Sequence, residues 1–191
     1  MSPHETPDRP DADARSHVLA EARSQFAKLK ALAESALQQV DDVQFFAEPA
    51  PEVNSIAMVV KHMAGNARSR WTDFLTTDGE KPDRHRDTEF ELDPGSTRDA
   101  LMAAWEAGWR ALDTALGPLG PDDLMRTVTI RGEGHTVLQA IDRQLTHYGY
   151  HVGQIVLLAR MARGKAWSSL SVPRGQSEQF NAQMRERNRK I

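Results

Sequence analysis

The chain has 191 residues, of which 39% are hydrophobic and 27% are charged, and its formal net charge is −3. This length suits one domain with a sizeable core, and the charge balance excludes a general attraction to nucleic acid or anionic membranes. The absence of cysteine excludes disulfides, thiolate metal ligands and a cysteine nucleophile. Neither a membrane-spanning apolar stretch nor a signal-peptide pattern is present, so we expect a cytoplasmic protein.

The N-terminal part begins with a polar segment and continues into a helix. Residues 1–13 contain three prolines and few apolar side chains, which predicts a disordered tail before a single domain at 14–191. Apolar residues at spacings of three and four predict an amphipathic helix from Ala14 to Val40. Two prolines in 41–53 indicate a connection that contains no continuous helix.

The next helix begins at an N-cap, Asn54 or Ser55, and its apolar positions extend to Leu75. His62 borders the apolar stripe of this helix, and Asn66 follows it by one turn on the same face. The polar segment after this helix, 78–95, is predicted to be a charged loop. Its His85 lies among arginines, which disfavour a metal cation, and is a poor candidate ligand.

Two further helices complete an all-α, four-helix bundle. Ser96–Leu116 is amphipathic, and Leu124–Ile130 followed by a glycine-rich turn predicts a short extended segment or hairpin. Thr136–Arg163 is apolar around most of its circumference, which is typical of a central bundle helix. Two glycines in this helix would allow close approach of a neighbouring helix, and 177–190 is predicted to add a short polar helix.

The last bundle helix contains His147 and His151, four residues apart and therefore on one helix face. Two imidazoles so placed can share one divalent metal ion. His62 is the predicted third ligand, because inward groups from facing bundle helices converge on one centre. The competing interpretation is that these are histidines of the core or of a groove, without a metal. His135, near the helix start, is a weaker candidate and is better explained as an N-terminal polar residue.

Three polar residues are predicted to support the histidines. Asn66, Gln144 and Gln154 lie one turn or less from a candidate ligand and could orient an imidazole or a bound water by hydrogen bonding. Surface or interface hydrogen bonding is the alternative for Gln144 and Gln154. Three imidazoles suit zinc or nickel, and also iron or copper, and they leave coordination positions open, as catalytic metal sites do.

Two stretches carry a resemblance to a known superfamily. The chain resembles the DinB/YfiT-like metalloenzyme superfamily in two places. These are Asn-Ser-Ile-Ala-Met-Val-Val-Lys-His-Met-Ala-Gly-Asn at 54–66 and His-Tyr-Gly-Tyr-His-Val-Gly-Gln-Ile at 147–155. The segment Trp-Ser-Ser-Leu-Ser-Val-Pro-Arg-Gly-Gln-Ser at 167–177 is similar to its DUF1572 subgroup. The resemblance implies a four-helix bundle over about 15–180, with metal ligation by His62, His147 and His151.

Several members of that superfamily are metal-dependent transferases or isomerases that use low-molecular-weight thiols. The resemblance therefore implies a thiol-dependent S-transferase acting on a small electrophile, and the thiol would come from a cofactor because this chain has no cysteine. A metal-dependent hydrolase and a non-catalytic, stress-related metal-binding or scaffold bundle remain alternatives. No acid, base or tyrosine, including Tyr148 and Tyr150, is placed beside the histidines by periodicity, so whether the protein is an enzyme stays open.

The expected partner is a small-molecule substrate, with no nucleic acid and no membrane. A homodimer is also predicted, because four tryptophans exceed what one small core usually hides: Trp71, Trp105, Trp109 and Trp167.

Overall fold

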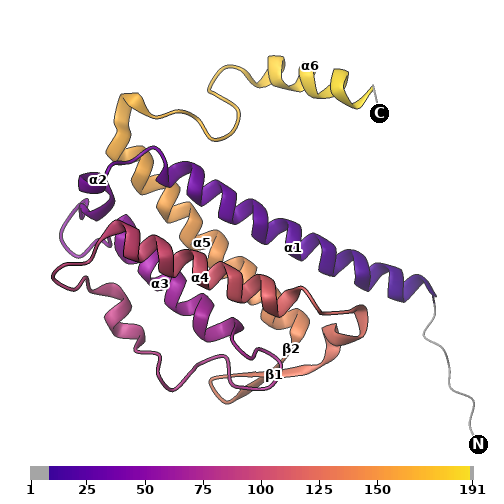
Figure 1. The fold of residues 1–191 in the computed structure, drawn as a ribbon. Coiled ribbons are helices and arrows are strands. Elements are labelled where there is room, and N and C mark those ends of the chain that lie inside the picture. The colour runs from indigo at the N-terminus through magenta and orange to yellow at the C-terminus, as the bar shows by residue number, and fades with distance from the viewer. Residues whose placement is uncertain (1–8, 190–191) are drawn as a thin grey trace, which may run out of the picture.

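The computed structural model describes residues 9–189 and consists of a bundle of four long helices (Figure 1). These are α1 (Arg9–Leu37), α3 (Ile56–Trp71), α4 (Arg98–Leu116) and α5 (Val137–Arg163). Helix α3 packs along α4, and α1 packs along α5, and the two pairs enclose one hydrophobic core. The predicted all-α bundle with a short extended segment before its last helix is confirmed.

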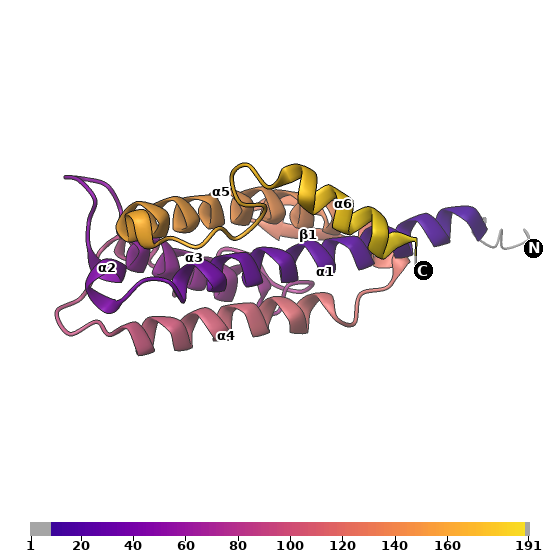
Figure 2. The same cartoon turned by 90° about the horizontal axis from the view of Figure 1, so that it is seen from above.

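Shorter elements lie between and after the bundle helices. They are α2 (Asp42–Phe46), η1 (Arg86–Phe90), η2 (Pro121–Met125), β1 (Thr127–Ile130), β2 (Glu133–Thr136), η3 (Gly164–Ala166) and α6 (Ser177–Asn188). The prediction missed α2 and η1, because elements of five residues are too short to show a hydrophobic period. Figure 1 shows α6 apart from the four long helices, and in Figure 2, seen from above, it is drawn over them. None of its residues is buried.

Two helix boundaries differ from the prediction. Helix α1 begins at Arg9 and not at Ala14, so residues 9–13 belong to the first turns of a helix and not to a disordered tail. Proline is tolerated in a first helical turn, where its missing N–H would have no intrahelical partner. Residues 1–8 of the predicted tail lie outside the described residues. Helix α3 ends at Trp71 and not at Leu75, because the backbone of Thr72 is extended.

A β-hairpin connects α4 to α5 through the antiparallel strands β1 and β2, in which Ile130 pairs with Glu133. Its two turn residues, Arg131 and Gly132, have φ angles of 56° and 78°. The carboxylate of Asp78 accepts hydrogen bonds from both of their N–H groups, at 2.8 and 2.7 Å. The hairpin turn is therefore held beside the loop that follows α3.

An aromatic cluster joins the four bundle helices at Tyr148 of α5. The Tyr148 ring meets Phe26 of α1 at 5.9 Å and Trp109 of α4 at 5.2 Å, and Phe26 meets Trp71 of α3 at 6.1 Å. Each contact is edge-to-face, a favoured arrangement of aromatic rings. Since Tyr148 is 1% exposed, it fixes the rotation of α5 about its axis. Its neighbour His147 is thereby directed out of this cluster.

The structure removes the reason given for one packing prediction, the homodimer, which stays a prediction, and contradicts another, the close helix contact at the glycines of α5. Trp71, Trp105 and Trp109 are buried within the chain and Trp167 is half-buried, so the tryptophans give no argument for a homodimer. The two glycines of α5, Gly149 and Gly153, have no other atom close to where a Cβ would stand, so they serve no close helix contact.

None of the helices within residues 9–189 combines the length and the apolar character that a membrane span needs.

Candidate metal centre

His62 of α3 and His147 and His151 of α5 meet between these two helices. The Nε2 atom of His147 lies 3.3 Å from Nε2 of His62 and 3.1 Å from Nε2 of His151. One ligand atom from each of the three residues falls within a cluster no wider than 4.8 Å. His62 and His151 are buried, and His147 is half-buried. The structure thus brings together the three histidines that the sequence singles out, in a cluster that could hold a metal ion.

The hydrogen-bond partners of His62 and His151 determine which ring nitrogen carries the proton. Nδ1 of His62 lies 2.8 Å from the carboxylate of Glu89, and Nδ1 of His151 lies 2.7 Å from Oε1 of Gln154. Both partners are acceptors, so both Nδ1 atoms donate, and in the neutral imidazoles Nε2 keeps its lone pair. Two lone pairs are therefore directed toward His147, as metal ligation requires.

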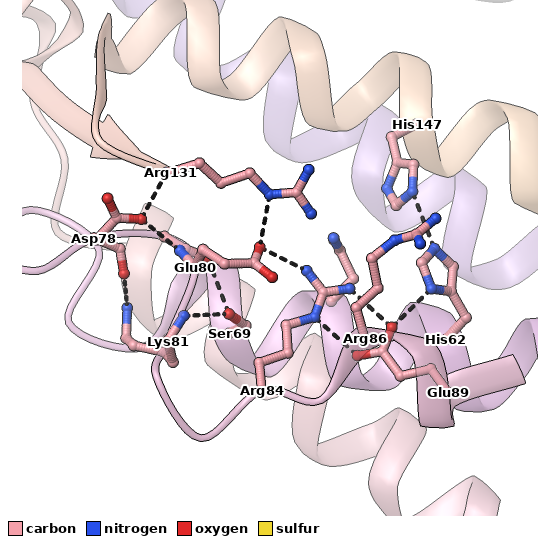
Figure 3. A network of polar contacts seen from close by, with 12 residues as sticks. His62, Ser69, Asp78, Glu80, Lys81, Arg84, Arg86, Glu89, Arg131 and His147 are labelled. Carbon is pink, nitrogen blue, oxygen red and sulfur yellow. Dashed lines mark hydrogen bonds and ion pairs between the residues drawn. The ribbon is translucent and has the colours of Figure 1, made fainter.

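Glu89 reaches His62 from η1, in the segment predicted to be a loop. Arg84 holds its carboxylate with two hydrogen bonds of 2.8 Å, and Arg84 also contacts Glu80 at 3.0 Å (Figure 3). Burial raises the pKa of Glu89, but the hydrogen bonds from Arg84 and His62 outweigh it, so the pKa is lowered below its usual value. Glu89 is therefore an ionised acceptor for Nδ1 of His62.

Gly65 makes room for this carboxylate on α3, one turn after His62. A Cβ atom at position 65 would stand 2.3 Å from Oε1 of Glu89, which is well inside van der Waals contact. The ring of Phe90 stacks on that of His62, with centroids 4.7 Å apart. The side chain of His62 is thus fixed by a hydrogen bond and by a stacking contact from the same short element.

The third histidine, His147, is supported by two amides. Nε2 of Gln144 lies 3.3 Å from Nδ1 of His147 and donates to Oδ1 of Asn66 at 2.7 Å. In this arrangement the His147 proton belongs on Nε2, between the lone pairs of the other two rings. If both amides turned over together, Gln144 would accept from Nδ1 of His147 and the Asn66–Gln144 hydrogen bond would be retained. The two amides can therefore serve both protonation patterns of His147.

Burial keeps two of the histidines neutral. The pKa of His147 is lowered to about 3. Desolvation is the largest cause, and the neighbouring His151 and His62 also lower it. Desolvation also lowers the pKa of His151 to about 4, although its hydrogen bond to Gln154 acts in the opposite direction. Neutral imidazole is the form that binds metals, so His147 and His151 are in their binding form at neutral pH.

A cavity of about 670 Å³ lies beside the cluster, and all three histidines line it. Tyr150 also lines it, and its hydroxyl accepts a hydrogen bond of 3.0 Å from Nε2 of Gln154. By contrast, the hydroxyl of Tyr148 is buried, in line with its place in the aromatic core. The centre is thus accessible to a small molecule from one side.

The sequence identifies part of this site and misses part of it. Asn66, Gln144 and Gln154 lie beside the cluster as expected, whereas His85 and His135 lie outside it. His135 instead lies 3.6 Å from the carboxylate of Glu133. Glu89 and Arg84 were not predicted, because they come from an irregular, uniformly charged segment in which no periodicity marks an inward side chain.

A family model described as "Protein of unknown function (DUF1572)" matches residues 13–176, which include the four bundle helices almost entirely and all three histidines. No curated protein and no solved structure matches the chain.

The lowered pKa values predict that metal-free protein loses stability in mild acid. The folded pKa values of His147 and His151 are about 3 and 4, whereas imidazoles of an unfolded chain titrate near pH 6.5. As the pH falls from 6.5 to 4, the unfolded chain therefore binds more protons, and the free energy of unfolding decreases. Urea midpoints of chelator-treated protein at pH 7 and pH 5 measure this decrease.

The double variant His147→Gln and His151→Gln should show a smaller decrease, and His85→Gln, an exposed position outside the cluster, should behave as wild type. An equal decrease in the double variant and in wild type would mean that other groups cause the acid sensitivity.

Proposed function

The chain belongs to the DUF1572 family, and we propose from its own site that it is a metal-dependent enzyme that transfers a thiol to a small electrophile. The metal is held by His62, His147 and His151. The DinB/YfiT-like placement, the identity of the metal as zinc or nickel, and the use of a low-molecular-weight thiol are parts of this proposal.

One observation supports it most directly. The Nδ1 atoms of His62 and His151 donate to Glu89 and Gln154, so their Nε2 lone pairs face the same point as Nε2 of His147. Metal-ligating histidines commonly donate their second ring N–H to a carboxylate or a carbonyl oxygen in this way.

The spacing of the nitrogens fits a small divalent ion. Ligands about 2.05 Å from a tetrahedral metal are about 3.3 Å apart, and in octahedral geometry neighbouring ligands are about 2.9 Å apart. The Nε2 atom of His147 lies 3.3 Å from that of His62 and 3.1 Å from that of His151, and both separations lie within that range. The donor set of three neutral imidazoles suits zinc and nickel, and also iron and copper.

The openness of the site supports catalysis over a structural role. Structural zinc sites usually have four protein ligands, and among the described residues the cluster has three. The cavity beside it leaves room for a substrate next to the open coordination positions. A divalent metal held there would supply a Lewis acid that favours the deprotonated, nucleophilic form of a thiol.

The chain's own residues hold and shape the site in this proposal. Arg84 and Glu89 fix the ring of His62, and Gln154 fixes the ring of His151. Gln144 contacts His147 and Asn66, and if both amides turned over together they would support the other protonation pattern of His147. The protein supplies no sulfur nucleophile because it has no cysteine, so the thiol must be a cofactor or a substrate.

Metal analysis of protein purified without an affinity tag tests the centre. We expect about one divalent metal per chain, and its loss in His62→Ala, His147→Ala and His151→Ala, because two imidazoles alone do not form a stable centre. His85→Ala and His135→Ala are matched controls outside the cluster and should keep the metal. A wild-type protein that stays metal-free after reconstitution with zinc and nickel would refute the proposal.

Glu89→Gln should weaken metal binding about 10- to 100-fold, because the amide removes the charged acceptor that orients His62. A competition titration against a chromophoric chelator measures the affinity. Glu91→Gln, an exposed change nearby, should leave it unaltered. If both variants bind metal as wild type does, the contact between Glu89 and His62 has no part in ligation.

The reaction is tested with a low-molecular-weight thiol and an activated aryl chloride. A C–S bond forms, the C–Cl bond breaks, chloride leaves and the thiol proton passes to the buffer. We expect the rate to require metal and to be lost in His147→Ala. Metal-dependent hydrolysis of an activated ester without thiol would support the hydrolase alternative. Bound metal without either reaction would support a non-catalytic bundle.

A further inference from the structure

A buried arginine without a partner lies in the cavity of the metal centre. Arg70 of α3 is 4% exposed, and its Nε and Nη1 atoms have no hydrogen-bond partner among the described residues. Desolvation, with a contribution from the nearby Arg143, lowers the pKa of Arg70 to about 10, so the side chain still carries its charge at neutral pH. A buried, unpaired guanidinium is costly, and such groups are normally paired.

The position of Arg70 on α3 connects it to the histidines. His62, Asn66 and Arg70 follow one another at intervals of four residues, so they share the face of α3 that lines the cavity. His62 and Arg70 are eight residues apart, which corresponds to about 12 Å along the helix. A ligand of moderate length could therefore contact the metal centre and Arg70 together.

The other charged residues that line the cavity are also arginines, and no acidic residue lines it. Arg84 and Arg131 share the carboxylate of Glu80, and Arg84 also binds Glu89. Arg86 lies over the ring of Phe90 and pairs with the exposed Asp87. Figure 3 shows the contacts of Arg84 with Glu80 and Glu89, and that of Arg131 with Glu80. Neither Arg70 nor the exposed Arg143 has a carboxylate partner among the described residues.

We propose that Arg70 and Arg143 form an oxyanion subsite that binds the carboxylate or phosphate of a small molecule whose reacting group lies at the three histidines. The proposal rests on the proposed function, and it specifies the substrate or thiol cofactor as an anionic, elongated molecule. The two arginines approach from α3 and α5, on either side of the cavity. A guanidinium offers a planar fork of donors that matches a carboxylate or a phosphate.

The structure also separates this role from a purely structural one. A structural arginine holds partners by hydrogen bonds, so its removal destabilises the protein. Arg70 holds none through Nε and Nη1, and Gly79 leaves the space that its guanidinium occupies, because a Cβ there would stand 2.9 Å from Nη1. Replacing it by an apolar residue of similar length should therefore leave the anion-free protein at least as stable.

The test is anion-induced stabilisation of the full-length chain. Metal-free protein at pH 8, where His147 and His151 are neutral, is titrated with inorganic phosphate and, in a second arm, with glutarate, each at constant ionic strength set with chloride. We expect one of the two anions to raise the melting temperature saturably. Arg70→Met and Arg143→Met should each raise the Kd about tenfold or more, because a charged hydrogen bond is lost. The arm that responds identifies the oxyanion.

Arg160→Met is the matched control, since Arg160 is exposed on the same helix as Arg143 and does not line the cavity. It should keep the wild-type response. The proposal is overturned if neither anion stabilises the protein beyond chloride, or if Arg70→Met responds as wild type does. It is also overturned if Arg70→Met lowers the melting temperature without anion while leaving the Kd unchanged, because that result indicates a structural role.

Use of metal-free protein keeps the two proposals distinguishable. A saturable, Arg70-dependent anion response in a protein that never binds metal would leave the subsite standing and refute the metal enzyme. A protein that binds metal through its histidines but shows no anion response would refute the subsite alone.

Discussion

The site depends first on how Tyr148 packs. Its ring is buried against Phe26 and Trp109, and consecutive helical residues point about 100° apart. With Tyr148 committed to the core, His147 and His151 face α3, where His62 meets them. A different rotation of α5 would send the two imidazoles to solvent or into the core, so the hydrophobic packing of the bundle sets the geometry of a polar centre.

A second constraint is the cost of burying charge beside the histidines. Glu89 and Arg84 are nearly inaccessible to solvent, with side chains that are 8% and 4% exposed, and they satisfy one another with two hydrogen bonds. Glu80 extends the pairing to Arg131 on the hairpin. Such buried pairs are weak contributors to stability but are costly to break, so they fix positions more than they strengthen the fold. The hairpin and η1 are thereby tied to the orientation of His62.

The sequence predicted the helical part of this arrangement because helical periodicity is visible in a single chain. Three features follow from 3.6 residues per turn. They are the spacing of His147 and His151, the position of His62 beside the apolar stripe of its helix, and the placement of Asn66, Gln144 and Gln154 near these histidines. Glu89 could not be found in this way, since it comes from an irregular segment where only tertiary contacts decide which charge turns inward. Arg70 does follow His62 and Asn66 on one face, but an arginine is ordinarily expected to face solvent.

Gly65 gives the site a recognisable signature in other chains. Only a residue without a side chain admits the carboxylate of Glu89 over α3, and Arg84, five residues before Glu89, holds that carboxylate in place. The combination therefore reads, in sequence order, as His-x-x-Gly on the second bundle helix followed by Arg-x-x-x-x-Glu before the next. A homologous chain with a bulkier residue in place of Gly65 would have to orient its first histidine by other means. The pattern would thus separate homologous sequences built around a carboxylate-anchored imidazole from those that are not.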